Sequence, residues 1–268
     1  MSILRSLKYT LHQLRHTDAR SLARAIKYRV WPARSKHTSF ILDVIRDQVG
    51  LEVGGPSNVF RAKQLLPIYP LVKRIDNVNF ASTTAWESDL HNEGAFSFHP
   101  TKSPGRQFLR EATHLQGFAA ESYDFLLSSH CLEHLANPLA ALREWNRVIR
   151  PGGHLVLIVP NREYTFDHRR PVTLFAHLQS DFEANMREDD LTHLKEILEF
   201  HNLRRDPGAG TPEEFHARSL QNRENRCLHH HVFDLDLLDA ALKDTGWRTL
   251  YLEKVPPLHL LAFGVRDH

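Results

Sequence analysis

The sequence predicts an α/β protein with a doubly wound, mostly parallel sheet. Three observations support this prediction. From residue 38 onward, short apolar runs bounded by turn residues alternate with segments of helical periodicity. The first apolar run ends in Gly54-Gly55-Pro56, where a parallel strand would meet a ligand-binding loop. The last two apolar runs are separated by Pro256-Pro257, which favours an antiparallel hairpin at the end of the sheet.

The individual elements follow from the same two periodicities. The expected strands are short apolar runs next to turn residues, and they cover residues 51–53, 71–75, 108–111, 123–127, 154–159, 247–255 and 258–265. The expected helices repeat apolar residues at three- and four-residue spacing, and they cover residues 39–49, 58–66, 138–149, 190–200, 212–220 and 235–243. Residues 80–106 are polar and are expected to form a loop.

Two segments depart from the alternation. Residues 161–233 are polar and histidine-rich, and they are too long for a connecting loop, so we expect a helical cap insertion. Residues 1–37 are expected to form a basic helical arm, since residues 1–36 hold nine Lys or Arg and only one acid, Asp18. The arm is either a solvated helical face packed on the domain or a contact with an anionic surface. The main domain then spans residues 38–268, cap included.

Composition is typical of a globular enzyme, with 41% hydrophobic and 25% charged residues. Cys131 and Cys227 provide no disulfide framework, which fits a reducing cytoplasm. A peripheral contact of the basic arm would then be with the inner membrane surface. No run of 18 apolar residues predicts a transmembrane segment, and no apolar stretch near the N-terminus predicts a signal peptide. We expect no nucleic-acid partner.

Acidic residues follow the first three expected strands and favour a nucleoside ligand. Glu52 lies beside the two glycines, and the dinucleotide fingerprint G-x-G-x-x-G is absent, so a cationic cofactor fits this loop better than a pyrophosphate. Asp76 comes 24 residues later, where a carboxylate accepts hydrogen bonds from both hydroxyls of a ribose. Glu111 follows the third strand, where a carboxylate accepts a hydrogen bond from an exocyclic amine.

The linked motifs resemble those of class I S-adenosylmethionine-dependent methyltransferases, in the branch called methyltransferase type 11. They are Glu52-Val53-Gly54-Gly55, Asp76, Tyr123-Asp124-Phe125, Leu132-Glu133-His134 and Arg150-Pro151-Gly152-Gly153. The resemblance covers residues 48–161, extends more weakly to 265, and implies a seven-stranded sheet. Gly54-Gly55-Pro56 departs from the usual Gly-x-Gly, so the resemblance defines the position of the cofactor's methionine end less exactly. Segments of the cap, including residues 160–173 and 228–233, resemble caps of members encoded beside glycosyltransferases.

The resemblance assigns cofactor contacts residue by residue. Glu52, Gly54 and Gly55 would border the methionine moiety of S-adenosylmethionine, and Asp76 with its neighbour Asn77 the ribose. Glu111 and Ala112 would meet the adenine. Ser129 and His130 would lie beside the sulfonium. The protein must then align the acceptor and take a proton from it if the acceptor is a hydroxyl.

The stretch SSHCLEHLANP leaves two interpretations open for one divalent metal ion. Some O-methyltransferases carry Glu-x-x-Glu-His at this strand end and a further histidine about 60 residues on. By that resemblance the ligands here would be His130, Glu133, His134 and His193. Alternatively, Glu133 and His134 only begin the following helix, without metal. An inverted zinc-protease motif would need one long helix, and Pro138 argues against that.

The expected activity is methyl transfer from S-adenosylmethionine to a hydroxyl of a sugar, in a surface glycan or its precursor. Without a metal ion, His193 or His231 is the expected general base. Arg169 and Arg170 would engage a phosphate or carboxylate of this small-molecule or glycan substrate. The alternatives are N- or C-methylation of a small metabolite, and a non-catalytic cofactor-binding partner in glycan assembly. The acceptor and the oligomeric state stay open.

Overall fold

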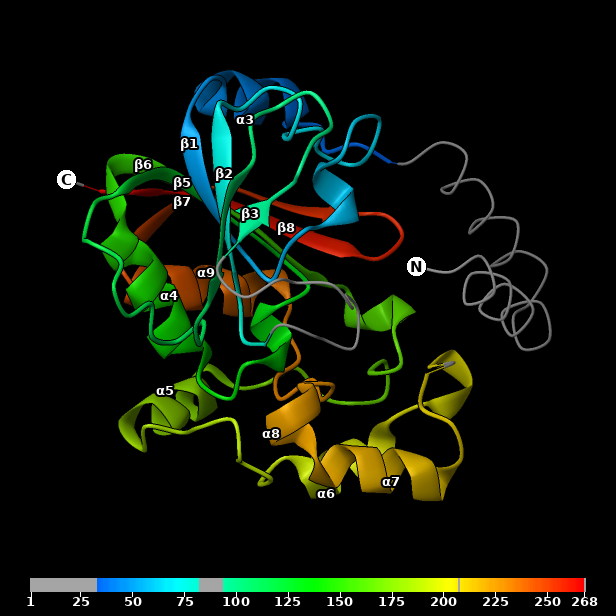
Figure 1. The fold of residues 1–268 in the computed structure, drawn as a ribbon. Helices are drawn as coiled ribbons and strands as arrows, with labels where there is room; N and C mark the ends of the chain where they lie inside the picture. Colours follow the sequence, from blue (N-terminus) through cyan, green and yellow to red (C-terminus); the bar gives the residue numbers. More distant parts are fainter. Residues whose placement is uncertain (1–32, 82–93, 207, 268) are drawn as a thin grey trace.

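The computed structural model describes residues 33–81, 94–206 and 208–267 (Figure 1). The predicted arm, residues 1–37, therefore lies outside the described residues except for its last five. Within the described part of the chain, no helix is long and apolar enough to cross a membrane.

An eight-stranded sheet forms the centre of the molecule, in the order β3-β4-β2-β1-β5-β6-β8-β7. Strands β4, β2, β1, β5 and β6 run parallel, and β8 pairs antiparallel with both β6 and β7. The predicted fold class is confirmed, hairpin included, but the sheet has eight strands rather than the expected seven, because β3 adds a short edge strand. The strands are β1 Val49–Val53, β2 Arg74–Asn79, β3 Ala95–Phe96, β4 Gly105–Leu109, β5 Tyr123–Ser129, β6 Ile149–Pro160, β7 Trp247–Val255 and β8 His259–Arg266.

Seven helices accompany the sheet in the described ranges, and polar side chains mark where several of them begin. The Asn137 side chain accepts a hydrogen bond from the backbone N–H of Ala140, and Pro138 takes the first helical position of α4. Thr211 and Glu214 form a reciprocal capping box at the start of α7. The helices are α3 Thr38–Ile45, α4 Pro138–Val148, α5 Phe175–Glu183, α6 Leu194–Phe200, α7 Pro212–Leu220, α8 Asn222–Asn225 and α9 Leu235–Asp244.

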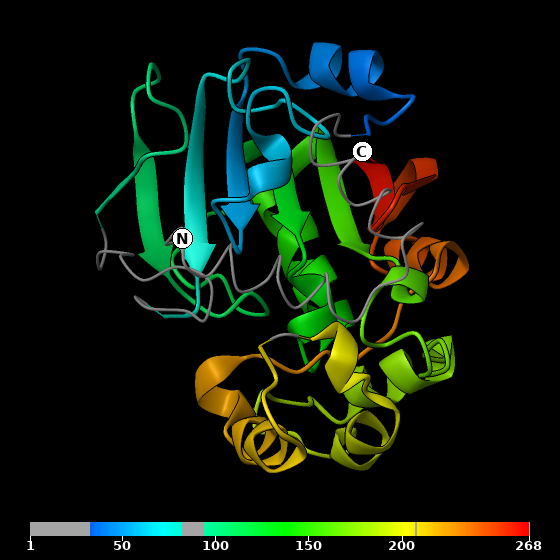
Figure 2. The same ribbon diagram turned by 90° about the vertical axis from the view of Figure 1, so that its right-hand side faces the viewer.

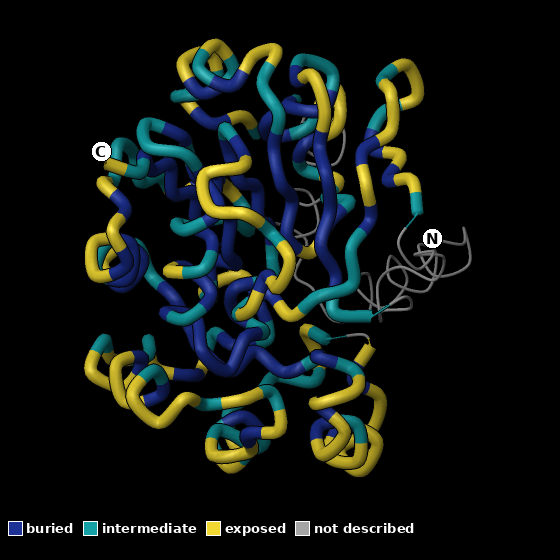
Figure 3. The backbone as a smooth tube through the Cα atoms, turned by 60° about the vertical axis from the view of Figure 1, so that its left-hand side comes forward, coloured by how far each residue is buried: buried dark blue, intermediate teal, exposed yellow. Residues whose placement is uncertain are grey.

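The sheet is buried on both faces, as the apolar strands predict. Along β6, Leu155, Leu157 and Val159 enter the hydrophobic cluster under α4 and α9. The alternate residues Val156 and Ile158 enter the cluster on the opposite face, under α3. Figure 3 shows the strands as buried, while the helices of the cap expose much of their surface.

Several predicted boundaries are wrong, each for a local reason. The helix expected at 58–66 is only a 3₁₀ turn, Asn58–Phe60, since Pro67 lies just ahead and the following residues pack irregularly on the core. The second strand starts at Arg74 and continues to Asn79, so Asp76 lies inside it rather than at its end. Within the expected loop 80–106, β3 and the start of β4 form a short antiparallel pair at the edge of the sheet.

The cap segment 161–233 lies beyond the carboxyl ends of β1 and β2 (Figures 1 and 2). It contains α5 to α8. Four of its buried residues form a separate small hydrophobic cluster: Ile197, Ala209, Phe215 and Leu228. In parallel α/β sheets ligands bind at this edge, so the cap covers the place where a site is expected.

Replacing Gly105 with alanine should destabilise the sheet strongly. A Cβ at this position would lie 1.7 Å from the backbone oxygen of Ile75 on β2. Backbone on a central strand cannot move aside cheaply, so we expect a loss of at least about 3 kcal/mol in the free energy of unfolding. Denaturant titration measures it. Gly264→Ala in β8 is the matched control, because its nearest contact is an ordinary 3.5 Å. Equal effects of the two substitutions would contradict the close approach of β4 to β2.

Candidate functional site

Two buried polar groups shape the loop after β1. Glu52 is fully buried, and its two carboxylate oxygens accept hydrogen bonds from the Ser57 backbone N–H at 3.0 Å and the Tyr69 hydroxyl at 2.7 Å. Gly54 has a φ of +85°, which glycine adopts readily. A Cβ on Gly55 would lie 2.4 Å from the Glu52 carboxyl carbon. Glu52 therefore holds the loop from inside, and the glycines leave its backbone open to a ligand.

At the end of β2, amide side chains rather than a carboxylate face this loop. The Asn77 side chain accepts from the Gly55 N–H and donates to the Gly55 carbonyl oxygen, at 3.0 and 3.2 Å. Asn79 donates to the same oxygen at 2.8 Å. Asp76 lies further back, where it accepts hydrogen bonds from the Tyr123 hydroxyl and the Arg106 N–H. The expected position of Asp76 at the strand end is wrong, and its contacts show a carboxylate already engaged within the sheet.

After β4, the cap engages the expected adenine contact. Arg226 donates two hydrogen bonds to the Glu111 carboxylate, at 2.7 and 3.2 Å. Ala112 is buried, and its carbonyl oxygen accepts from the Trp145 indole. Arg226 of the cap therefore forms an ion pair with Glu111, a contact that the spacing of residues in the sequence did not predict.

After β5, the chain turns sharply and buries a carboxylate. His130 has a φ of +52°, an uncommon conformation outside glycine, and Ser129 before it is buried. Both oxygens of the buried Glu133 lack a hydrogen-bond donor among the residues that the structure describes. The nearest imidazole nitrogens, of His130 and His134, lie 3.6 and 4.0 Å from Oε1. Such a carboxylate is costly to bury unless a cation satisfies it.

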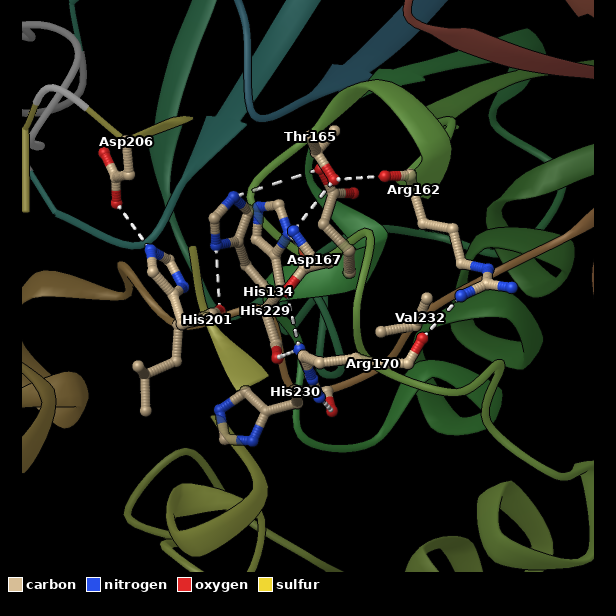
Figure 4. A network of polar contacts seen from close by, with 12 residues as sticks. His134, Arg162, Thr165, Asp167, Arg170, His201, Asp206, His229, His230 and Val232 are labelled. Atoms are coloured by element: carbon tan, nitrogen blue, oxygen red, sulfur yellow. Dashed lines mark hydrogen bonds and ion pairs between the residues drawn. The ribbon is translucent and has the colours of Figure 1, made fainter. Parts of the chain in front are cut away.

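The cap brings a third imidazole to Glu133. The donor atoms of Glu133, His134 and His229 all lie within 4.8 Å of one another. The Nδ1 of His134 lies 3.0 Å from the Leu228 carbonyl oxygen, and the Nδ1 of His229 lies 2.5 Å from Asp167 Oδ2. Each contact orients its ring from behind, as a carbonyl oxygen or a carboxylate does for metal-ligating histidines. Figure 4 shows the His134 and His229 rings side by side.

The charges of this cluster are strongly coupled. Burial acts to raise the pKa of Glu133, but the neighbouring His130 and His134 outweigh it and lower the pKa. Burial, together with the nearby His229, lowers the pKa of His134 to about 4. A neutral imidazole beside an ionised carboxylate is the protonation state that binds a divalent cation. Burial acts to lower the pKa of His229, but Asp167 outweighs it and raises the pKa, so this ring must lose a proton before it can bind such a cation.

The predicted metal set differs from this cluster in two members, since it included His130 and His193 and lacked His229. His193 lies not with Glu133 and His134 but in a second cluster, with His177, Asp181 and His231. The reason is the path of the cap, which brings residues 228–231 rather than 193 to the end of β5. The sequence signal for His229 was the triplet His229-His230-His231, whose members could not be assigned without the structure.

The two histidines expected to act as general bases have both ring nitrogens engaged. His193 contacts Asp190 through Nδ1 at 3.2 Å and His177 through Nε2 at 2.6 Å. His231 contacts the Leu135 carbonyl oxygen through Nδ1 and Asp181 through Nε2. Neither ring offers a nitrogen for an acceptor's proton, so the structure does not support that role.

The two arginines expected to bind substrate differ. Arg170 is buried, and its guanidinium donates to Asp167, Glu196 and the carbonyl oxygens of His229 and His230 (Figure 4). With its donors used inside the cap, Arg170 is a structural residue, and the prediction that it binds the acceptor is wrong. Arg169 is exposed, so its role in acceptor binding stays a prediction.

Replacing Glu52 with glutamine should remove a pH dependence of stability. Burial raises the pKa of Glu52 from 4.5 to about 7. The folded state therefore holds this proton more tightly than the unfolded state. Its stabilisation is complete below pH 4.5 and is lost as the pH rises toward 7, by up to about 3 kcal/mol. The free energy of unfolding, measured from pH 5 to 8, should fall relative to Glu52→Gln. Glu199→Gln, at an exposed position of α6, is the control. A constant difference between wild type and Glu52→Gln would contradict the buried proton.

Comparison with known proteins gives the fold a family context. Residues 89–157 match the family model described as a methyltransferase domain, and no curated protein matches the chain. An S-adenosylmethionine-dependent methyltransferase from Methanosarcina mazei superposes with a TM-score of 0.50 at 14% identity, over 85% of this chain and 97% of that one. One from Mesorhizobium loti gives a TM-score of 0.50 at 12% identity, over 85% and 95%. The chain therefore has the class I methyltransferase fold, and residues 89–157 match a methyltransferase domain.

Proposed function

We propose that this protein transfers the methyl group of S-adenosylmethionine to a hydroxyl of a sugar, in a surface glycan or its precursor. The observation that carries the choice of a hydroxyl is the buried carboxylate of Glu133 with its two imidazole neighbours at the end of β5. An amine or a carbanion acceptor has no need of such a cluster, whereas a hydroxyl must be oriented and must lose a proton.

The loop after β1 fits the cofactor. Positive φ at Gly54 and the lack of room for a Cβ at Gly55 leave bare backbone at the carboxyl edge of the sheet, where the methionine end would bind. Asn77 and Asn79 hold the Gly55 carbonyl oxygen and so fix the loop. When bound, S-adenosylmethionine supplies a methyl group on a positively charged sulfur. Ser129 and His130, after β5, would border that sulfur.

The Glu133 cluster fits a divalent ion, because its orphaned carboxylate and two oriented imidazoles offer three ligands and leave positions open. When bound, such an ion lowers the pKa of an acceptor hydroxyl and orients it. Glu133, His134 and His229 would hold the ion. His130, whose side chain is 30% exposed at the end of β5, would accept the hydroxyl proton once its Nε2 leaves His259 Nδ1, which lies 3.0 Å away.

The transfer balances without another reactant. The acceptor oxygen forms a bond to the methyl carbon while the carbon–sulfur bond breaks, and its electron pair stays on sulfur. The sulfonium becomes the neutral thioether of S-adenosylhomocysteine, and the hydroxyl proton leaves to a base. The sugar acceptor rests on the resemblance of the cap segments, and exposed Arg169 would engage a phosphate or carboxylate on it.

Calorimetry with S-adenosylmethionine and S-adenosylhomocysteine should show binding to the purified full chain. Formation of S-adenosylhomocysteine should then appear with monosaccharides, methyl glycosides or nucleotide-linked sugars, and the product should carry an O-methyl group. A deoxy analogue lacking the methylated hydroxyl is the matched control, and it should give no product. Methylation on nitrogen or carbon would favour a small-metabolite enzyme instead. Cofactor binding without turnover would favour a non-catalytic partner. A protein that binds no cofactor at all would contradict both the methyltransferase proposals and the non-catalytic one.

Glu133→Gln should lower turnover by about 10²–10⁴-fold while cofactor affinity changes little, because the substitution removes the charge that holds the ion but keeps the side-chain shape. Chelation of the wild type should have the same effect, and added Mn²⁺ or Zn²⁺ should reverse it. His216→Ala, on the exposed face of α7, is the control for removing a cap histidine. Full turnover of metal-free wild type, or of Glu133→Gln, would rule out metal-assisted transfer.

A further inference from the structure

A second cluster of metal-binding side chains lies inside the cap, apart from the Glu133 cluster. His177 and Asp181 are four residues apart on α5 and so face the same side of that helix. His193 directly precedes α6, and His231 lies in the extended segment before α9. One donor atom from each of these four side chains lies within 4.8 Å of the other three.

Three of the contacts between these donor atoms are 3.4 Å or shorter. Asp181 Oδ2 lies 2.9 Å from His231 Nε2 and 3.4 Å from His177 Nε2. His177 Nε2 lies 2.6 Å from His193 Nε2. Metal bonds of about 2.0 Å in a tetrahedron place the ligand atoms about 3.3 Å apart. Of these three contacts, the 2.6 Å one lies furthest below that spacing, and the His177 side chain, 44% exposed, has room to turn outward.

The surroundings of His231 show why a cation suits this place. Its Nδ1 faces the Leu135 carbonyl oxygen at 3.2 Å, and its Nε2 faces Asp181 Oδ2. A neutral imidazole carries one N–H, whereas two acceptors face the two nitrogens of this ring. If Asp181 is ionised, one of these two contacts brings together two lone pairs with no proton between them. A proton on Asp181 or a cation among the four donors removes the conflict, and only the cation uses all four.

The outer contacts orient the inner ligands. The Asp190 carboxylate lies 3.2 Å from His193 Nδ1 and is itself held by the backbone N–H and the hydroxyl of Thr192. The Leu135 carbonyl oxygen does the same for His231. A carboxylate or carbonyl behind the far ring nitrogen fixes the tautomer of a metal-ligating histidine and points Nε2 at the metal.

We propose that His177, Asp181, His193 and His231 bind one zinc ion that has a structural role in the cap. Three imidazoles and one carboxylate favour Zn²⁺ over Mg²⁺ or Ca²⁺, which prefer oxygen ligands. Four protein ligands close the coordination shell, as in structural sites, whereas catalytic sites keep a position open. This site is distinct from the three-ligand Glu133 cluster, and it does not depend on the proposed methyl transfer.

The cap has a physical need for such a cross-link. Its parts pack on different cores, since Leu178 of α5 lies in the main hydrophobic cluster and Ile197 of α6 in the cap's own cluster of four buried residues. The ion would join α5, the start of α6 and the 228–231 segment, which are far apart in the chain. Because His229 is two residues from His231, the same cross-link would also keep His229 beside Glu133.

Metal content of the full chain tests the proposal. The protein is stripped with a chelator, dialysed against Zn²⁺ or Co²⁺, and assayed for bound metal by elemental analysis. Wild type should retain an ion in this site, should show the visible absorption of tetrahedral Co²⁺, and should melt at a higher temperature with Zn²⁺ than without. His177→Ala should weaken this binding by at least about 10–100-fold, the range for losing even an outer-shell partner. Its melting temperature should no longer respond to Zn²⁺.

Two further variants separate the sites. His177 is partly exposed, so His177→Ala should fold, and His216→Ala removes an exposed histidine of the same cap without touching the cluster. Glu133→Gln alters only the other cluster and should keep the cap ion. Equal metal retention by His177→Ala and His216→Ala would overturn the proposal, as would a wild type that retains no ion. Loss of the only ion in Glu133→Gln, with His177→Ala unchanged, would assign the metal to the Glu133 cluster and exclude the cap site.

Discussion

The cap depends on one buried guanidinium. Arg170 donates hydrogen bonds to the carboxylates of Asp167 and Glu196 and to two consecutive backbone carbonyl oxygens, those of His229 and His230. A buried charge with all its partners is tolerated, and removal of any partner leaves an uncompensated charge. The guanidinium thereby fixes the backbone of the histidine triplet in the middle of a polar segment that has little hydrophobic core of its own.

With that backbone fixed, the imidazoles of His229, His230 and His231 contact three different sets of residues. His229 reaches Asp167 and the Glu133 cluster, while His230 contacts Asn222. His231 turns to Asp181. In an extended segment neighbouring side chains point to different sides, so a histidine run need not form one site. The Glu133 cluster and the cap cluster meet at this triplet, yet one offers three ligands and the other four. A third group of possible ligands, Asp190, His193 and His230, shares His193 with the cap cluster.

Arg226 connects the cap to the segment that follows β4. It pairs with Glu111 after β4 at 2.7 Å and with partly buried Glu188 of the cap at 3.2 Å, and its guanidinium stacks over the ring of Phe80. Burial raises the pKa of Glu188 to about 7, and Arg226 partly offsets this effect. Cap and sheet are thus joined by polar contacts at both ends of the site, Arg226 at one and the His134–Leu228 contact at the other.

The sequence by itself determined the sheet, the hairpin, the cap and the loop after β1, because apolar periodicity and paired glycines are local signals that burial on both faces enforces. It also indicated that Glu133 and His134 belong to a cluster. Only the tertiary structure decided the members of that cluster, since a spacing of 59 or 95 residues says nothing about which histidine arrives beside a carboxylate. It likewise placed Asp76 within its strand, buried Arg170, and gave His193 to another cluster. Partners from distant segments are chosen by how the cap packs, and that packing is a property of the whole fold.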